Sequence, residues 1–270
     1  MASHLLPTIT RILMRRPAQN AADGITSVSE KGVPNYDLML QQYDAYVSVL
    51  RSAGLDVQVL EPDARFPDGH FVEDPLVIFR DLVFLCKSGA AARRDEGESL
   101  LQHLPPHLTQ CVVRMQDEKA CLDGGDVLFC SDRVLIGTSE RTNLAGARAL
   151  RDALVRVQPD LRVDFVPFSG VLHLKTGVTE LAPNVLVRDP ALTTSYDFSW
   201  AAQIITLPPE EGYAADVMPL VGRDMILIVD GHPTLRRVAE KYYAPHNVVA
   251  LEMSEFEKMD GGLTCLSLRF

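Results

Sequence analysis

Short apolar runs alternate with polar turns along the chain, and one longer stretch has helical periodicity instead. In residues 36–53 the apolar positions recur every three to four residues, which predicts an amphipathic helix. Asn35 is a suitable N-cap and Gly54 a suitable C-terminal stop for this helix. The runs at 9–14 and 57–60 are predicted to be strands that flank it.

From residue 74 onward the chain repeats a single pattern. A polar residue begins a short apolar strand, a polar turn leads into a second strand, and a loop then enters a helix. The residues that begin the five units are Asp74, Asp126, His173, Asp216 and Cys265. A period of about 50 residues is typical of repeat architectures, and closing the units into a ring removes exposed edge strands. We therefore predict an α/β ring of ββα-type units in which the polar strand heads converge on a central site.

Composition restricts the class of protein. The 270 residues are 47% hydrophobic and 23% charged, and no Pro-, Gly- or Ser-rich linker divides them, so a single domain over 1–270 is predicted. No apolar run approaches the roughly 18 residues of a membrane-spanning helix, and the N-terminus lacks signal-peptide features. We expect a cytoplasmic protein that contacts no membrane.

Charge and cysteine usage exclude further classes. The formal net charge of −10 argues against a nucleic-acid partner and is compatible with a cationic small molecule. The five cysteines show no CxxC spacing, so neither a disulfide framework nor a structural metal is indicated. No glycine-rich phosphate loop is present, so we expect no nucleotide and no other cofactor. A homodimer is an assembly that the sequence allows.

The unit heads combine a thiol, an imidazole and several carboxylates. Taken alone, Cys265 fits an inert core thiol as well as a nucleophile, and His173 fits a core histidine as well as an acid or base. Clustered carboxylates are costly to bury unless they meet a positive group, and a guanidinium matches them best. Arg93 and Arg141, each ahead of a helix, fit either surface charges or partners of a ligand carboxylate. A guanidino amino acid is therefore the predicted small-molecule ligand.

At these residues the sequence resembles the dimethylarginine dimethylaminohydrolases (dimethylargininases) of the guanidino-modifying pentein superfamily. The segments that carry the resemblance are Phe71-Val72-Glu73-Asp74-Pro75, Leu122-Asp123-Gly124-Gly125-Asp126, Leu172-His173-Leu174-Lys175-Thr176-Gly177 and Asp260-Gly261-Gly262-Leu263-Thr264-Cys265. Shorter matches extend from Arg16 to Phe270. The resemblance implies the pentein fold, a five-bladed α/β propeller with pseudo-fivefold symmetry.

The resemblance also implies roles for three catalytic residues. Cys265 corresponds to the nucleophile that attacks the guanidinium carbon. His173 corresponds to the acid that protonates the departing amine and then to the base for water. Asp123 corresponds to the carboxylic acid that orients the histidine. The resemblance assigns no metal to this chemistry.

Substrate binding is implied at nine further positions. These positions are Ile25, Asp68, Phe71, Glu73, Asp74, Arg93, Arg141, Met259 and Asp260. Asp68, Glu73 and Asp74 would hold the guanidinium side, and the two arginines the α-carboxylate. The carbonyl of Ile25, in a flap loop, would accept the α-amino group, with Met259 as a second candidate.

The implied reaction is hydrolysis of asymmetric dimethylarginine or monomethylarginine to citrulline and an alkylamine, through an S-alkylthiouronium intermediate on Cys265. Three alternatives stay open on the sequence: deimination of arginine or another guanidino acid, amidino transfer, and binding without catalysis. One departure from the family pattern is Asp216, which follows Tyr-Ala-Ala where relatives carry Asn-Cys.

Overall fold

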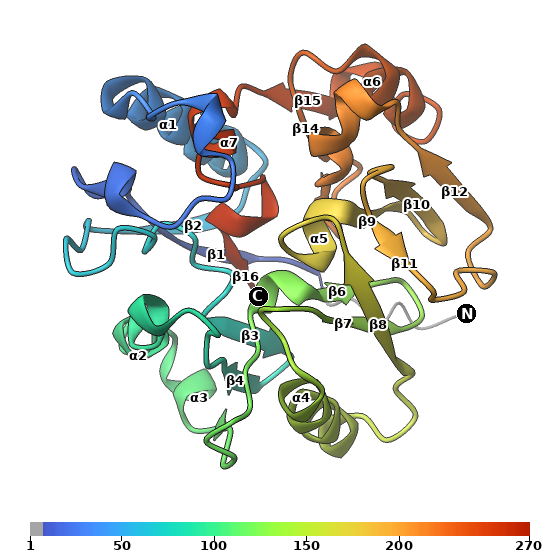
Figure 1. Ribbon diagram of the computed structural model, residues 1–270. Helices are drawn as coiled ribbons and strands as arrows, with labels where there is room; N and C mark the ends of the chain where they lie inside the picture. Colours follow the sequence, from blue (N-terminus) through green and yellow to red (C-terminus); the bar gives the residue numbers. More distant parts are fainter. Residues whose placement is uncertain (1–7) are drawn as a thin grey trace.

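The computed structural model describes residues 8–270 as an α/β fold built from five separate small sheets (Figure 1). The first three sheets along the chain are β3 (Leu76–Phe79), β4 (Leu82–Leu85) and β5 (Val112–Arg114); β6 (Val127–Phe129), β7 (Val134–Thr138), β8 (Val163–Ser169) and β11 (Thr193–Thr194); and β9 (Val178–Ala182), β10 (Val185–Arg188) and β12 (Gln203–Thr206). The fourth contains β13 (Met218–Pro219), β14 (Ile226–Val229) and β15 (Val248–Leu251), and the fifth contains β16 (Leu268–Arg269), β1 (Arg11–Arg15) and β2 (Asp56–Leu60).

All five sheets share one pairing scheme. An end strand pairs antiparallel with a central strand, and the central strand pairs parallel with a third strand. In the fifth sheet the central strand is β1, so the two ends of the described chain meet there, with Ile12 opposite Arg269. This matches the expectation that the N-terminal strand completes the last unit.

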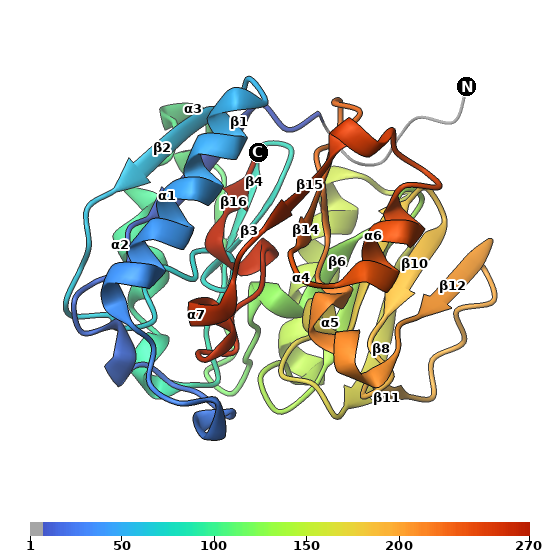
Figure 2. The ribbon, with the colours of Figure 1, turned by 90° about the horizontal axis from the view of Figure 1, so that it is seen from above.

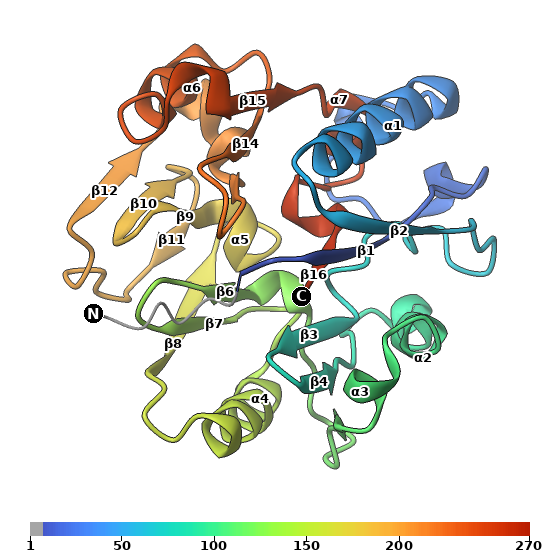
Figure 3. The same cartoon turned by 180° about the vertical axis from the view of Figure 1, so that it is seen from behind.

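The longer helices lie at the periphery of the molecule, whereas the short helix that follows His173 lies near its middle. The helices are α1 (Tyr36–Ser52), α2 (Glu96–Leu101), α3 (Pro106–Thr109), α4 (Leu144–Val157), α5 (Leu174–Gly177), α6 (Pro233–Ala239) and α7 (Ser254–Glu257). Figures 1 and 3 show α1, α4 and α6 at the periphery, with β16 and the C-terminus close to the middle. Viewed from above, α1 and β12 lie at opposite sides of the molecule (Figure 2). One apolar cluster packs α1 and α6 against β14 and β15, and another packs α4 against the strands of the first two sheets.

The predicted long helix is confirmed, and so are its ends. The Asn35 side chain accepts a hydrogen bond from Leu38 N at 3.0 Å, and Gly54 follows the helix at φ +76°. The same logic holds for α4, where the Asn143 side chain accepts from Gly146 N at 2.9 Å.

Three strand predictions were wrong in extent. The strand expected to begin at Asp216 is reduced to β13, because Asp216 itself ends the 3-10 helix η5 (Pro209–Ala215) as its C-cap. Cys265 does not begin a strand; it lies in the one-turn 3-10 helix η7 (Thr264–Leu266), and β16 starts three residues later. Asp126 likewise ends a 3-10 turn rather than opening a strand.

Within residues 8–270, no helix is long and apolar enough to cross a membrane.

Candidate active site

A small cavity lies where the strand heads and the flap loop meet. Its volume is about 20 Å³. Ten of the twelve predicted site residues line it: Ile25, Asp68, Phe71, Asp74, Arg93, Arg141, His173, Met259, Asp260 and Cys265. The fold therefore brings together residues that are separated by up to 240 positions in the chain.

The turn before Cys265 requires its two glycines. A Cβ on Gly262 would lie 1.9 Å from Asp216 Oδ2, and one on Gly261 would lie 2.2 Å from the Phe71 ring. Only glycine allows the backbone to approach this closely. Burial raises the pKa of the Cys265 thiol well above its ordinary value, and the nearby carboxylates of Asp216 and Asp74 raise it further. The thiol is therefore protonated at neutral pH until a positive charge arrives beside it.

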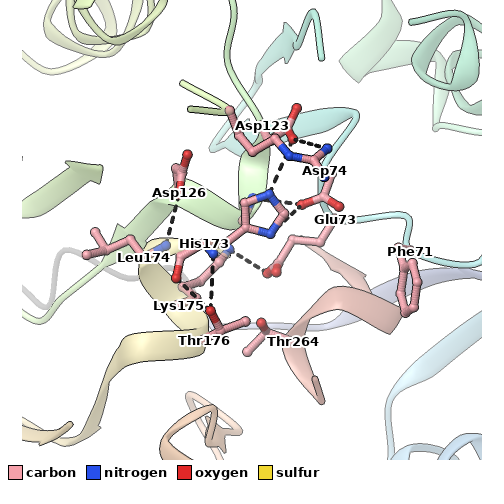
Figure 4. Close-up of polar contacts among 12 residues, drawn as sticks. Phe71, Glu73, Asp74, Asp123, Asp126, His173, Leu174, Lys175, Thr176 and Thr264 are labelled. Carbon is pink, nitrogen blue, oxygen red and sulfur yellow. Dashed lines mark hydrogen bonds and ion pairs between the residues drawn. The ribbon is translucent and has the colours of Figure 1, made fainter. Parts of the chain in front are cut away.

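His173 lies between two carboxylates, as Figure 4 shows. Its Nε2 is 3.3 Å from Asp123 Oδ2 and its Nδ1 is 3.7 Å from Asp74 Oδ1. Burial alone lowers the pKa of this imidazole, but Asp74, Asp123 and Asp126 outweigh it and raise the pKa to about 9. The ring is thus an imidazolium at neutral pH and holds a proton that it can donate. Its backbone N–H donates to Thr176 Oγ1 at 3.1 Å, which fixes the start of α5.

Asp74 joins His173 to Arg93. The Arg93 Nη1 donates to Asp74 Oδ2 at 2.6 Å, and both side chains are buried. Burial raises the pKa of Asp74, but His173 and Arg93 together bring it down to about 2. This carboxylate is therefore ionised at any physiological pH and can attract a cationic group.

The two predicted arginines differ in their surroundings. The guanidinium of Arg93 is fully engaged, because it also donates to both Glu96 oxygens and to the Phe71 carbonyl. Arg141 is 19% exposed, and the carboxylate nearest to it, Asp123 Oδ2, is 3.9 Å away. Arg141 is thus the cation that is more available to a ligand anion.

The flap, the loop that contains Ile25 and Ser27, forms one wall of the cavity. Ile25 N donates to both Asp68 oxygens at 3.1 and 3.2 Å. Asp260 accepts from Ser27 N at 2.5 Å and from Ser27 Oγ at 2.9 Å. Burial raises the pKa of Asp68, and Arg93 opposes that shift. The flap is therefore latched to the walls of the site by carboxylates on both sides.

Two comparisons of sequence identify the family. A sequence profile described as "N,N dimethylarginine dimethylhydrolase, eukaryotic" matches residues 18–168. The N(G),N(G)-dimethylarginine dimethylaminohydrolase of Pseudomonas aeruginosa is 34% identical over 260 residues, which cover 96% of this chain and 98% of that protein. This chain belongs to the dimethylarginine dimethylaminohydrolase family.

Other relatives extend the match. The dimethylarginine dimethylaminohydrolase of Streptomyces coelicolor is 34% identical over 259 residues, covering 96% of each chain. The solved structure of a cysteine-to-serine mutant of the Pseudomonas aeruginosa enzyme, complexed with citrulline, superposes with a TM-score of 0.87. That structure is 32% identical and covers 97% of this chain and all of the other. The α/β fold expected from the repeat pattern is thus shared with the family.

Two predicted site residues of this family member lie outside the cavity lining. Asp123 lies behind His173, which it contacts from the side away from Asp74. Glu73 points elsewhere: its Oε1 accepts from Lys175 Nζ at 2.7 Å (Figure 4). The same oxygen also accepts from Arg269. Glu73 contacts the site through its backbone, where its N–H donates to the Cys265 carbonyl at 3.2 Å.

Sequence reasoning missed four residues of the site and its support. Leu172 and Gly261 line the cavity, and each was detectable as the direct neighbour of a predicted residue. Glu96 pairs with Arg93 at i,i+3 spacing, a signal that the sequence contained. Nothing in the sequence indicated that Lys175 pairs with Glu73, because they lie 102 positions apart.

Across the described 8–270 range, no group of three His, Cys, Asp or Glu side chains could hold a metal ion.

Proposed function

We propose that this protein hydrolyses Nω-methylated arginines to citrulline and methylamine or dimethylamine. The observation that carries the proposal is the joint placement of Cys265 and His173 on one cavity with the carboxylates of Asp68 and Asp74. A cavity lined by a thiol, an imidazolium and two carboxylates suits a cationic substrate that undergoes nucleophilic attack. The names of the family relatives, and the citrulline bound in one of them, point to the same reaction.

We assign the first chemical step to Cys265. The guanidinium of the substrate lies between Asp68 and Asp74, and its positive charge beside the sulfur offsets the burial that keeps the thiol protonated. As the substrate binds, the thiol releases its proton to solvent, and the thiolate forms a bond to the guanidinium carbon. His173 then gives its proton to the alkylated nitrogen and the C–N bond breaks. The amine departs, and an S-alkylthiouronium remains on Cys265.

We assign the second step to the now neutral His173. It takes a proton from water as the oxygen attacks the thiouronium carbon, the C–S bond breaks, and citrulline and Cys265 are released. Asp123 holds the imidazole in place through its 3.3 Å contact. Apolar side chains of Phe71, Leu172 and Met259 offer no hydrogen bonds, so they suit the methyl groups of the substrate better than bare N–H groups.

We infer the remaining features from the same evidence. The five sheets with one pairing scheme support a five-bladed, pseudo-symmetric propeller, and residues 1–270 form a single catalytic domain. Arg141, with Arg93 after rearrangement, binds the α-carboxylate. The free state of all five cysteines supports a cytoplasmic location. Homodimerisation remains a prediction.

The test is citrulline release from asymmetric dimethylarginine, monomethylarginine and arginine, measured in parallel. We expect citrulline from the two methylated substrates and much less from arginine. Cys265→Ser is expected to lower turnover by at least about a thousandfold, whereas Cys111→Ser, at an exposed cysteine, leaves it unchanged. Citrulline chiefly from arginine would instead make the protein a deiminase, and full activity of Cys265→Ser would refute the assigned nucleophile.

A further inference from the structure

A second and larger cavity lies behind the active site, and it shares no lining residue with it. Its volume is about 290 Å³. Glu73 and Thr264 line this cavity, while their chain neighbours Asp74 and Cys265 line the active site. The two cavities are therefore back to back, separated by the thickness of the chain at these two positions.

The walls of the larger cavity are mainly apolar. Each of the five sheets contributes its end strand: β3, β6, β9, β13 and β16. Figures 1 and 3 show β3, β6 and β16 close to the middle of the molecule. Leu76, Ile78, Leu128, Met218 and Leu220 are among the side chains that line the cavity. A strand of four residues spans roughly 13 Å, so the walls can enclose an extended chain of about eight atoms.

The inner end of this cavity carries an excess of positive charge. Lys175 and Arg269 both donate to one oxygen of Glu73. The buried carboxyl of Asp216 also lies near these two cations, but burial and Glu73 raise its pKa to about 7, so it offsets only part of their second charge. The Glu73 and Lys175 side chains are buried. Within residues 8–270, the buried Arg269 Nη1 has no hydrogen-bond partner. In the same cluster Glu73 Oε2 is also buried without a partner. Buried donors without partners are costly, so the Arg269 guanidinium presents an unsatisfied site for one carboxylate oxygen of a ligand.

The other charged residues of the lining are already satisfied. Glu180 accepts from Ser131 N and Asn184 N, at 2.8 and 2.9 Å. Arg223 donates to three backbone carbonyls, those of Ile9, Ala53 and Gly54. The opposite charges of Glu180 and Arg223 cancel in the net charge of the lining, so the charge that an occupant must match is the partial positive excess at Lys175 and Arg269.

We propose that this cavity is a binding site for a small monocarboxylate with an unbranched aliphatic tail of about six to eight carbons. The planar carboxylate fits the free edge of the Arg269 guanidinium, and the tail lies along the apolar end strands. The volume is close to the lower end of the range for small-ligand sites, about 300 Å³, which excludes bulky ligands. This site is separate from guanidinium chemistry and does not depend on it.

The first measurement is calorimetric titration of the full-length protein with acetate, butanoate, hexanoate and octanoate. Burying each methylene is worth about 0.8 kcal/mol, so we expect affinity to rise about fourfold per methylene until the cavity is full. Octylammonium, with the same tail and the opposite charge, is expected to bind at least about tenfold more weakly than octanoate. Equal affinity of the two, or no octanoate binding up to about 5 mM, overturns the proposal.

Three arginine variants locate the site. Arg269→Met is expected to weaken octanoate binding at least about tenfold, because it leaves Glu73 balanced by Lys175 alone. Arg11→Met is the matched control: Arg11 lies on the paired strand β1 but does not line the cavity. Arg141→Met removes the available cation of the active site and is expected to leave octanoate binding unchanged. Loss of binding in Arg141→Met with retention in Arg269→Met would place the carboxylate in the active site instead.

A direct measurement covers the case in which Arg269→Met does not fold. An octanoate analogue with a photoreactive diazirine at the end of its tail is cross-linked to the unmodified protein. We expect the labelled peptides to contain β3, β6 or β9, and octanoate to compete with labelling. Labelling confined to the flap or to residues 259–265 refutes the proposed site.

Discussion

At the scale of single residues, Asp74 holds together the two positive groups of the active site. It accepts from Arg93 at 2.6 Å and lies 3.7 Å from the His173 ring, and all three side chains are buried. Removing one partner of a buried ion pair leaves the other charge uncompensated, which costs far more than losing an exposed pair. The charge of Asp74 therefore supports both the fold and the proton on His173.

Asp74→Asn tests this role. We expect it to lower the free energy of unfolding by about 3–5 kcal/mol and to bring the pKa of His173 down from about 9. Urea denaturation and an NMR titration of the His173 ring measure the two effects. Asp44→Asn breaks the exposed pair with Arg16 and is expected to cost less than about 1 kcal/mol. Equal costs for the two variants, with an unchanged histidine titration, would show that Asp74 is not the source of either effect.

The ionisation of Asp216 leads to a prediction about how stability depends on pH. Burial, reinforced by Glu73, raises the pKa of this carboxyl to about 7. Because the folded-state pKa lies above the unfolded value, the contribution of Asp216 to stability is fully present below about pH 4 and is lost as the pH rises through 7. His173 also has a raised pKa, but its contribution is lost only between about pH 6.5 and 9.

Asp216→Asn removes the titrating group and keeps the size of the side chain. We expect the variant to gain stability relative to the parent protein by about 2–4 kcal/mol between pH 4 and pH 7, with little further change above that. Urea unfolding at intervals of half a pH unit measures the difference curve. Asp224→Asn, at an exposed aspartate of the same unit, is expected to give a flat curve. A flat curve for Asp216→Asn as well would mean that its carboxyl is not perturbed.

At the scale of elements, the sequence predicted helices better than it predicted the turns that carry the chemistry. α1 and α4 were detectable because the apolar period and the asparagine caps agree with each other. The 3-10 turns that hold Asp126 and Cys265 have three residues each, too short for any periodicity. Their position is set by contacts with other units, such as the bond from Thr264 N to Asp216 Oδ2, which local sequence does not encode.

The flap is an element whose state has a direct functional consequence. A cavity of about 20 Å³ holds little more than one water molecule, so the flap must move before an amino acid can enter. Asp260 holds the flap through both the N–H and the hydroxyl of Ser27. Opening must therefore break these two bonds.

Asp260→Ala is expected to loosen the flap. Hydrogen exchange of residues 24–32, followed by mass spectrometry, should become about tenfold faster, which corresponds to the loss of one to two hydrogen bonds. Glu30→Ala, at an exposed position of the same loop, is the matched control and should exchange like the parent protein. If both variants exchange alike, Asp260 does not hold the flap.

At the scale of the whole molecule, carboxylates link one repeat unit to the next. Asp74 Oδ1 accepts from Gly125 N at 3.1 Å, Asp126 Oδ1 from Leu174 N at 2.9 Å, and Asp216 Oδ2 from Thr264 N at 3.2 Å. The period of about 50 residues predicted both the five units and the convergence of their heads. It could not predict that Asp126 and Asp216 bond to backbone rather than face the site, because side-chain direction in a turn depends on the neighbouring unit.

The junction between the two ends of the chain is the last of these connections. Both Thr10 N and Arg11 N donate to the Phe270 carbonyl, and Phe270 N donates to the Arg11 carbonyl at 3.0 Å. Leu268 is buried in an apolar cluster with Leu13 and Leu60. Since Cys265 is only three residues before this strand, the position of the nucleophile depends on the junction remaining closed.

Deleting Leu268–Phe270 is therefore expected to damage both stability and activity. Loss of the buried leucine and of three backbone hydrogen bonds should cost about 4–5 kcal/mol, and loss of the Arg269 partner of the buried Glu73 adds to this. The fall in Tm should therefore be at least roughly 10 °C. Phe270→Ala keeps the backbone hydrogen bonds and should lower Tm by less than half as much. Differential scanning calorimetry measures the melting, and the rate of alkylation of Cys265 by iodoacetamide reports on the site. A truncated protein that melts and reacts like the Phe270→Ala variant would show that the short strand β16 is dispensable and that the apolar core alone positions Cys265.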